Sequence, residues 1–366
     1  MPNHAVIVRE VATSVSTPAT VETGIPFIVG LSPVHNAESP AGVGIPVMCY
    51  SYAEFVSKLG WSDDWDTYNL CEFAYAHFKL YGQSPAIFVN LLNPATMKSA
   101  VAAADKTVTA KKVELTVKGI DDAGLVIKAA GGNGNAYIKD TDYSVYYNEG
   151  GKLTVELLPD STHYTEASLN IAFNEVTPAS VNASAVAAGF EAVELCMTTL
   201  GMIPDLLVSP GFSKNSVVAA IMATKAAGIN GMFKAKALID IDTSVADSYD
   251  EVVAEKTAKN FFDKNQIVCW PMVKLGDLKF HLSSHLAGII ARTDYEYAAP
   301  YVSPSNKDMK CDTLIVAAGT EVILSLDQAN YLNANGVDTA LNFMGGFKAW
   351  ALTHVSASSQ WIKIYS

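Results

Sequence analysis

The chain has 366 residues, of which 50% are hydrophobic and 17% are charged, so it can bury a substantial core and is not intrinsically disordered. At roughly 150 residues per domain, this length predicts two or three domains. Its 25 Lys and Arg residues against 37 Asp and Glu residues give a net charge of −12, which disfavours binding to nucleic acid or to an anionic membrane.

The cysteines and the N-terminus predict a protein of a reducing compartment. The spacing of the five cysteines contains no C-x-x-C pair, so it predicts neither a metal knuckle nor a redox motif. An odd number of cysteines fits a cytoplasm that keeps thiols reduced. The first residues lack the layout of a signal peptide, and no run of 18 apolar residues occurs, so we expect a soluble protein made in the cytoplasm.

The N-terminal part of the chain predicts an arm followed by an α/β layer. Residues 1–23 alternate short β-branched runs with Thr, Ser and Pro, which is typical of an extended arm. The continuous apolar run 25–30 predicts a strand buried on both faces of a sheet. A capping box at 51–54 predicts a helix, the apolar stripe over 70–78 predicts a second one, and 86–90 predicts the next strand.

The pattern changes from about Lys106 to a period of two residues. Alternating segments separated by glycine-rich turns predict β-hairpins. The expected strands are 113–117, 125–127, 143–147 and 153–157. We therefore expect residues 98–180 to form a small β-rich domain inserted into the α/β one.

Helical and strand patterns alternate again in the second half. The expected helices are 184–199, 213–227, 248–262, 279–292 and 327–334, and the expected strands are 205–208, 237–241 and 266–270. This rhythm predicts an α/β fold, a mixed α+β sheet core with covering helices that carries the inserted β domain. The expected division is an N-terminal arm over 1–23, a discontinuous core over 24–97 and 181–350, the insert over 98–180, and an atypical C-terminal tail over 351–366.

Two histidines on one predicted helix are the strongest chemical signal. His281 and His285 lie at i and i+4, the spacing that a zinc site uses, and Asp294 is the nearest downstream carboxylate. The zincin pattern needs a Glu after the first His, and that position is Leu282. We therefore predict no metal ligand here and keep an α/β metal-dependent hydrolase that uses these three residues as the alternative function.

The remaining motifs predict no catalytic residue and no cofactor site. The glycine pairs lack the strand-to-helix context of a phosphate loop, and no G-x-S-x-G sequence occurs. The acidic aromatic run 61–66 is predicted to be an interhelical loop with Asp66 as a helix cap, and a sugar or cation site is the alternative.

Several segments in order resemble one protein family. They are 5–10, 23–30, 204–213, 237–243, 285–294, 303–307 and 335–343, and they resemble the tail sheath protein of contractile phages and phage-like bacteriocins. The matches run from residue 5 to about 350 and skip only the predicted insert. After Gly345–Trp350 the resemblance ends, because sheath proteins continue into a further C-terminal domain whereas this chain has Ala351–His354 and stops at Ser366. The expectation is a truncated or frameshifted prophage copy.

The resemblance implies a structural protein and not an enzyme. In the family, terminal arms add strands to a sheet of adjacent subunits, which implies a helical homopolymer around a tail tube protein, with baseplate and tail terminator proteins as further partners. It places the protein in the virion tail, assembled in the bacterial host cytoplasm, and implies no nucleic acid, membrane or cofactor. The expected subunit-linking residues are Val6, Ile7, Val8, Arg9 and Glu10. Another tail component, a tube protein or a baseplate adaptor, is the third hypothesis.

Overall fold

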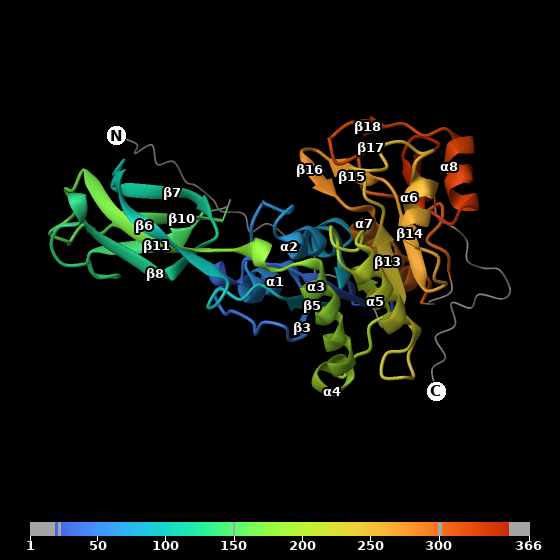
Figure 1. The fold of residues 1–366 in the computed structure, drawn as a ribbon, viewed down its shortest axis with the longest axis horizontal. Helices are drawn as coiled ribbons and strands as arrows, with labels where there is room; N and C mark the ends of the chain where they lie inside the picture. Colours follow the sequence, from blue (N-terminus) through green and yellow to red (C-terminus); the bar gives the residue numbers. More distant parts are fainter. Residues whose placement is uncertain (1–18, 21–22, 149–150, 299–301, 351–366) are drawn as a thin grey trace, which may run out of the picture.

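The computed structural model describes residues 19–20, 23–148, 151–298 and 302–350. Its buried apolar side chains form two separate clusters, a large one in the α/β core and a smaller one in the β-rich part. Figure 1 shows these two parts at opposite ends of the long axis of the molecule. Most of the predicted arm and all of the predicted tail over 351–366 lie outside the described residues.

A six-stranded sheet is the centre of the α/β core. Its order is β14 (Gln266–Cys269), β13 (Lys236–Asp240), β12 (Leu206–Val208), β2 (Pro26–Gly30), β5 (Ala86–Asn90) and β3 (Val47–Cys49). All neighbouring pairs are parallel except β3 with β5. Every residue of β2 and β5 is buried, as expected for apolar strands covered on both faces.

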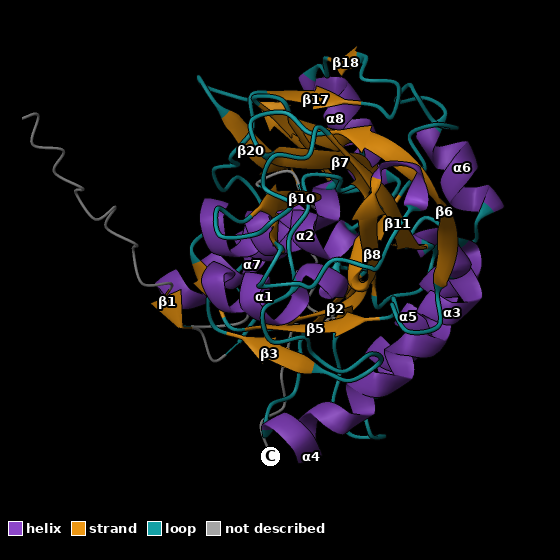
Figure 2. Cartoon of the chain, turned by 90° about the vertical axis from the view of Figure 1, so that its left-hand side faces the viewer, coloured by secondary structure: helices purple, strands orange, loops and turns teal. Residues whose placement is uncertain are grey.

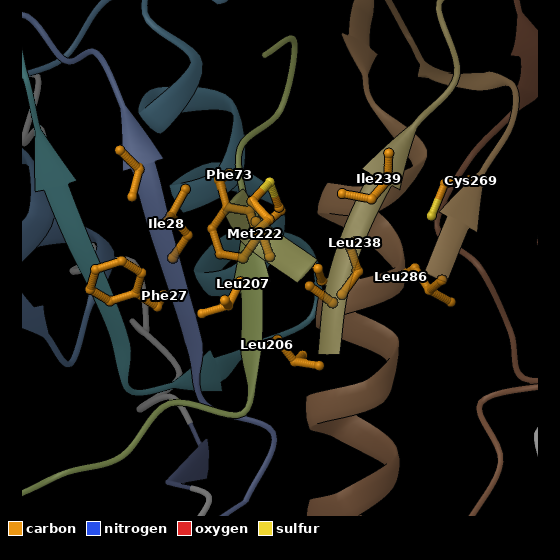
Figure 3. Packing of buried hydrophobic residues seen from close by; sticks show 14 of the residues in the cluster. Phe27, Ile28, Phe73, Leu206, Leu207, Met222, Leu238, Ile239, Cys269 and Leu286 are labelled. Carbon is orange, nitrogen blue, oxygen red and sulfur yellow. The ribbon is translucent and has the colours of Figure 1, made fainter. Parts of the chain in front are cut away.

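Helices cover both faces of this sheet. Their bounds are α1 Tyr52–Leu59, α2 Asn69–Ala74, α3 Ala183–Gly189, α4 Cys196–Leu200, α5 Ser216–Ala227, α6 Val252–Ala258, α7 Leu282–Tyr297 and α8 Leu326–Ala334. A π-helix, η2 (Tyr75–Leu80), continues α2, and short 3-10 helices are η1 Val34–Asn36, η3 Ala130–Gly132, η4 Pro178–Ser180 and η5 Phe190–Leu195. Figure 2 shows α1, α2 and α7 on one face and α3 and α5 on the other. Figure 3 shows Phe73 of α2 and Met222 of α5 packed near Leu207 of β12.

Three smaller sheets surround this core. One has the order β16 (Leu278–Phe280), β15 (Met272–Leu275), β17 (Thr313–Ile315) and β18 (Glu321–Val322). The second is the hairpin of β19 (Thr339–Asn342) and β20 (Phe347–Trp350). In the third, β1 (Ala19–Thr20) pairs in parallel with β4 (Gln83–Ser84).

The insert consists of two three-stranded antiparallel sheets. One has the order β6 (Lys98–Thr107), β11 (Ser168–Val176) and β8 (Ile120–Ala129), and the other has β7 (Lys112–Lys118), β10 (Lys152–Leu157) and β9 (Tyr143–Tyr147). Alternate residues of β11 are buried, and Leu169, Ile171 and Phe173 belong to the smaller hydrophobic cluster. The period-two pattern therefore has the physical basis expected of a half-buried sheet.

The predicted fold class is confirmed, and some of the predicted elements need correction. Only β9 and β10 form one of the expected hairpins, because β7 pairs with β10 and β8 pairs with β11, which lie far along the chain. The helix predicted over 279–292 starts instead at Leu282, since Leu278–Phe280 pairs with β15 as a strand. The capping Ser51 accepts the Glu54 N–H as predicted, whereas the Glu54 carboxylate accepts the N–H of Tyr50.

Among the described residues, one helical run is long and apolar enough to cross a membrane by length and composition. It is Ala183–Leu200, with a mean hydropathy of 1.3 and one third of its residues buried. The run is made of α3, η5 and α4 and contains Glu191 and Glu194, which pair with Lys225 of α5. This run packs against β2 and α5 of the α/β core.

We propose that residues 98–180 fold as a domain of their own, and a deletion tests this. The Thr177 N–H donates to the Met97 carbonyl at 2.8 Å, so the two ends of the insert meet. Of the described residues, none from 98 to 175 belongs to the larger cluster. A chain in which two glycines replace 98–175, the part of this domain outside the larger cluster, should stay soluble and unfold cooperatively by calorimetry. An aggregated product, or the loss of a single transition, would contradict the proposed boundary.

Two histidines buried in the α/β core predict acid sensitivity. His77 and His285 are both 0% exposed, and burial lowers their pKa from 6.5 to about 4 and about 3. The unfolded chain therefore binds more protons below pH 6.5, so the free energy of unfolding falls as the pH falls towards the folded pKa. Between pH 7.5 and pH 5 each histidine should remove about 2 kcal/mol.

Urea unfolding at these two pH values measures this loss for the wild type and for His77→Phe, whose ring would lie between Phe73 and Phe78. The variant should lose about 2 kcal/mol less than the wild type. His163→Phe, on the surface of the insert against Tyr137, is the control and should follow the wild type. Equal pH dependence in His77→Phe and the wild type would refute the assignment.

Candidate subunit-linking surface

The predicted linking residues Val6, Ile7, Val8, Arg9 and Glu10 lie outside the described residues. The nearest part of the arm that the structure describes is its root, at 19–20 and 23–25, and the hairpin of β19 and β20 is considered beside it. The positions of both depend on α7 and the strands around it, and a buried polar network holds α7 in place.

Two buried carboxylates hold the N-terminus of α7. Glu72 Oε1 accepts the N–H of His281 at 2.7 Å and the Ser284 hydroxyl at 2.7 Å. Asp240 Oδ1 accepts the Ser283 N–H at 3.1 Å. These bonds satisfy N–H groups that a helix leaves without a partner, and negative charge is favourable at that end of the helix dipole. The network ties α2 and the end of β13 to α7.

His281 is part of this network as a charged partner. Its Nδ1 lies 2.9 Å from Glu72 Oε2. Burial would lower the pKa of His281, but the carboxylates of Glu72 and Asp240 outweigh burial and raise this pKa to about 9. Burial raises the pKa of Asp240 above its usual value, although the hydroxyls of Ser213 and Ser283 donate to the carboxylate. The arrangement is a structural ion pair.

The structure does not bring the three residues of the hydrolase alternative together. His281 contacts Glu72, the Nδ1 of His285 lies 2.8 Å from the hydroxyl of Tyr81, and Asp294 accepts the hydroxyl of Thr23 at 3.1 Å. His285 and Asp294 are nine residues apart on α7, which is about 13 Å along the helix axis. Among the described residues, no group of three or more His, Cys, Asp or Glu side chains is placed to hold a metal ion. The hydrolase alternative is not favoured.

The aromatic run over 61–66 packs inward. The Trp65 ring lies 5.0 Å from the Phe280 ring and 5.3 Å from Tyr75, and the Trp61 ring lies 5.9 Å from Trp65. Asp66 is not the cap of α2, because the N-cap is Tyr68, whose N–H donates to the carbonyl of Asp64. These contacts assign the run a packing role.

The root of the arm is held against the core at two places. The strand β1 pairs with β4 through Ala19 and Thr20. Beyond it, the Thr23 hydroxyl donates to Asp294 Oδ2, and the Ile25 N–H donates to Asp205 Oδ2 at 3.2 Å. The chain then enters β2 in the middle of the main sheet.

The hairpin of β19 and β20 is joined to neighbouring segments on both sides. Among the described residues, β19 pairs only with β20, and its start is fixed by Asp338, whose N–H donates to the Val268 carbonyl and whose carbonyl accepts the Trp270 N–H. On the other side, β20 exchanges backbone hydrogen bonds with 306–309. Thr339, Ala340 and Leu341 of β19 are at most 4% exposed, so the edge of β19 opposite β20 is covered for most of its length in the single chain.

A cavity of about 200 Å³ lies beside this hairpin. Residues of β17, β18, β19, β20 and the segment after β18 line it, and they are Asp312, Thr313, Leu314, Glu321, Val322, Ile323, Leu324, Ala340, Leu341, Asn342 and Phe347. Ile323 at this cavity is 83% exposed. The cavity therefore adjoins the hairpin and is lined by an exposed apolar side chain.

The sequence analysis missed this hairpin as a site. The segment 335–343 entered only as part of the family resemblance. Two short runs that flank Gly345 and Gly346 are a hairpin signal that would have found it. Asp294 was considered only as a metal ligand, and no pattern indicates that it receives the arm root, because the contact joins residues 271 positions apart.

Sequence comparison gives two relatives, while no family model matches the chain. The chain is 25% identical over 295 residues to the tail sheath protein of Burkholderia phage BcepMu, an alignment that covers 74% of this chain and 59% of that protein. It is 31% identical over 169 residues to a prophage major tail sheath protein of Pseudomonas aeruginosa, covering 43% of this chain and 40% of that protein. The chain thus spans about half the length of these relatives.

Solved structures found by comparison of the fold include one baseplate chain and two sheath tail proteins. One is a chain of the anti-feeding prophage baseplate, with 15% identity, a TM-score of 0.49, and coverage of 96% of this chain and 68% of that chain. The sheath tail proteins of Listeria innocua and Desulfitobacterium hafniense have 14% and 10% identity and TM-scores of 0.45 and 0.47. They cover 91% and 94% of this chain and 69% and 74% of their own.

Both curated relatives carry the family name that the ordered segments of the sequence predicted. Their alignments extend over 295 and 169 residues, well beyond any one of those segments. The resemblance of this chain to the tail sheath proteins of contractile phages is therefore confirmed by its similarity to curated sheath proteins.

Proposed function

We propose that the chain is a structural protomer of a contractile tail sheath, which polymerises helically around a tail tube and contracts by a rigid-body rearrangement of its subunits. The observation that carries the proposal is the 25% identity to a phage tail sheath protein over 74% of the chain. The role needs no catalytic residue and no cofactor. The polar network at α7 joins α2 and β13 to α7, as a rigid structural subunit requires.

The hairpin provides the acceptor for the linkage between subunits. Residues Val6–Glu10 of one copy would add as a strand to the edge of β19 opposite β20 in another copy and displace what covers that edge in the single chain. Alternate side chains of that strand point to opposite faces, so Val6 and Val8 would lie on one face and Ile7 on the other. The cavity beside Ala340 and Leu341 offers apolar surface to one of these faces.

Such a linkage builds a filament. The donor strand and the acceptor edge are different surfaces, so the contact is heterologous, and when the rotation does not close it generates a helix. Contraction then moves whole cores as rigid bodies while the arms keep neighbours joined. The many buried residues of the main sheet and its helices give each core the rigidity that this motion requires.

The partners follow from this role. Besides other copies of the chain, they are the tail tube protein, the baseplate and the tail terminator, and the protein would be located in the virion tail after assembly in the host cytoplasm. An infectious phage, a prophage and a bacteriocin-like particle all fit this description.

Electron microscopy of the purified full chain tests the proposal. The expected result is hollow, transversely striated tubes whose yield rises with protein concentration, because a heterologous contact polymerises by mass action. The same chain in mild denaturant that dissociates oligomers is the control. If only isolated particles form at every concentration, alone and together with its tube protein, the sheath role is wrong.

A substitution at the cavity tests the acceptor. Ile323 is 83% exposed, so Ile323→Asp should leave the melting temperature nearly unchanged but lower the yield of tubes about tenfold, since it puts a charge where the added strand docks. Met344→Asp is the matched control, because Met344 is 89% exposed at the hairpin tip and does not line the cavity. Hydrogen exchange should also find amides 6–10 protected in tubes only. Equal assembly of the two variants would exclude this acceptor.

A further inference from the structure

The root of the arm fits closely against the C-terminal part of α7. Gly24 is buried and has a φ of +72°, a conformation that other residues rarely adopt. A Cβ added there would lie 3.0 Å from the Cα of Ala291 and 3.0 Å from Oδ2 of Asp294. The backbone at Gly24 therefore lies directly on the α7 backbone, and only glycine leaves room for this contact.

The residues on both sides of Gly24 are held by carboxylates. The Thr23 hydroxyl donates to Asp294 Oδ2, and the Ile25 N–H donates to Asp205 Oδ2. Asp205 also returns a backbone bond, since its N–H donates to the Ile25 carbonyl at 2.8 Å. We call Asp205, Ala291 and Asp294 the arm seat.

Asp294 is an unfavourable residue for its position in the helix. It lies in the last turn of α7, where the helix dipole disfavours negative charge, and it is only 6% exposed. Residues that break local rules of this kind often mark functional positions. Here the carboxylate contacts the chain at the point where the arm joins the core.

We propose that the arm seat fixes the place and the direction in which the N-terminal arm leaves the core, so that the arm is presented to the hairpin of a neighbouring copy. Gly24 and Asp294 are positioning residues in this view. A fixed root lowers the conformational freedom that the arm loses on docking, and it raises the effective concentration of the arm at the neighbour. The inference rests on the proposed sheath function and adds to it the contacts that set the direction of the arm.

The experiment compares two glycines that share one backbone conformation. Gly44 also has a φ of +72°, but a Cβ added there would meet nothing within 4 Å. Gly24→Ala and Gly44→Ala thus carry similar backbone strain, and only the first disturbs the seat. Gly24→Ala should raise the concentration needed for tube assembly about tenfold relative to Gly44→Ala, as a poorly aimed arm lowers the effective concentration. Thr23→Val, which removes the hydroxyl but keeps the shape, should shift it in the same direction.

A second measurement uses the soluble chain. If the seat holds the arm root, hydrogen exchange at Ala19 and Thr20 of β1 should be about tenfold faster in Gly24→Ala than in Gly44→Ala, while the amides of β2 keep their protection. A purely structural role would lower the melting temperature and speed exchange in the core strands without a selective effect at β1.

The outcomes separate the seat from the sheath function. If Gly24→Ala assembles and exchanges like Gly44→Ala, the seat has no positioning role. If the wild type forms no tubes, the proposed function fails, and the exchange at β1 in the soluble chain still decides whether the seat holds the arm root.

Discussion

The hydrogen bonds from the N-terminus of α7 to Glu72 and Asp240 are the interaction on which the rest of the core depends. Both carboxylates are buried, and a buried charge is costly unless it is paired and hydrogen-bonded. Helix N–H groups, serine hydroxyls and the charged ring of His281 supply these partners. Removing one partner of a buried pair typically costs 3–5 kcal/mol, since the other charge then stays unpaired.

This anchoring determines where both ends of α7 lie. Because the helix is rigid and its first turn is attached to β13 and α2, its last turn is fixed relative to the main sheet. The last turn carries Asp294, which receives the arm root, and the preceding residues include Ala291, on which Gly24 packs. The buried polar network lies at the first turn of α7 and the arm root contacts its last turn, so one rigid helix connects the two.

The sequence predicted the elements whose pattern is local. The strand predicted over 86–90 coincides with β5. All five of its residues are buried. Pairing between distant strands was not predictable in this way, since β7 and β8 pair with β10 and β11 and not with each other. The strand β6 was missed because nine of its ten residues are exposed, so no alternation of apolar and polar residues marks it.

The candidate site was less accessible to sequence reasoning than the fold. Two histidines at helical spacing suggested a metal, but the partner of His281 comes from α2, more than 200 residues away in the chain. The arm seat likewise joins Thr23 to Asp294 and Ile25 to Asp205. A single sequence specifies such contacts only through the complete fold.

The proposed linkage through strand edges also requires that pairing through other edges be avoided. The longest exposed edge is β6, and its pairing with β11 is interrupted by a bulge, because Ala104 and Val101 lie opposite Ile171 and Phe173. Bulges twist an edge strand and hinder a flat partner. The hairpin edge at β19 is four residues long, and the net charge of −12 disfavours unspecific association. In the proposed linkage, a short edge combined with an arm of fixed direction would favour one partner geometry, which is what a regular helical lattice requires.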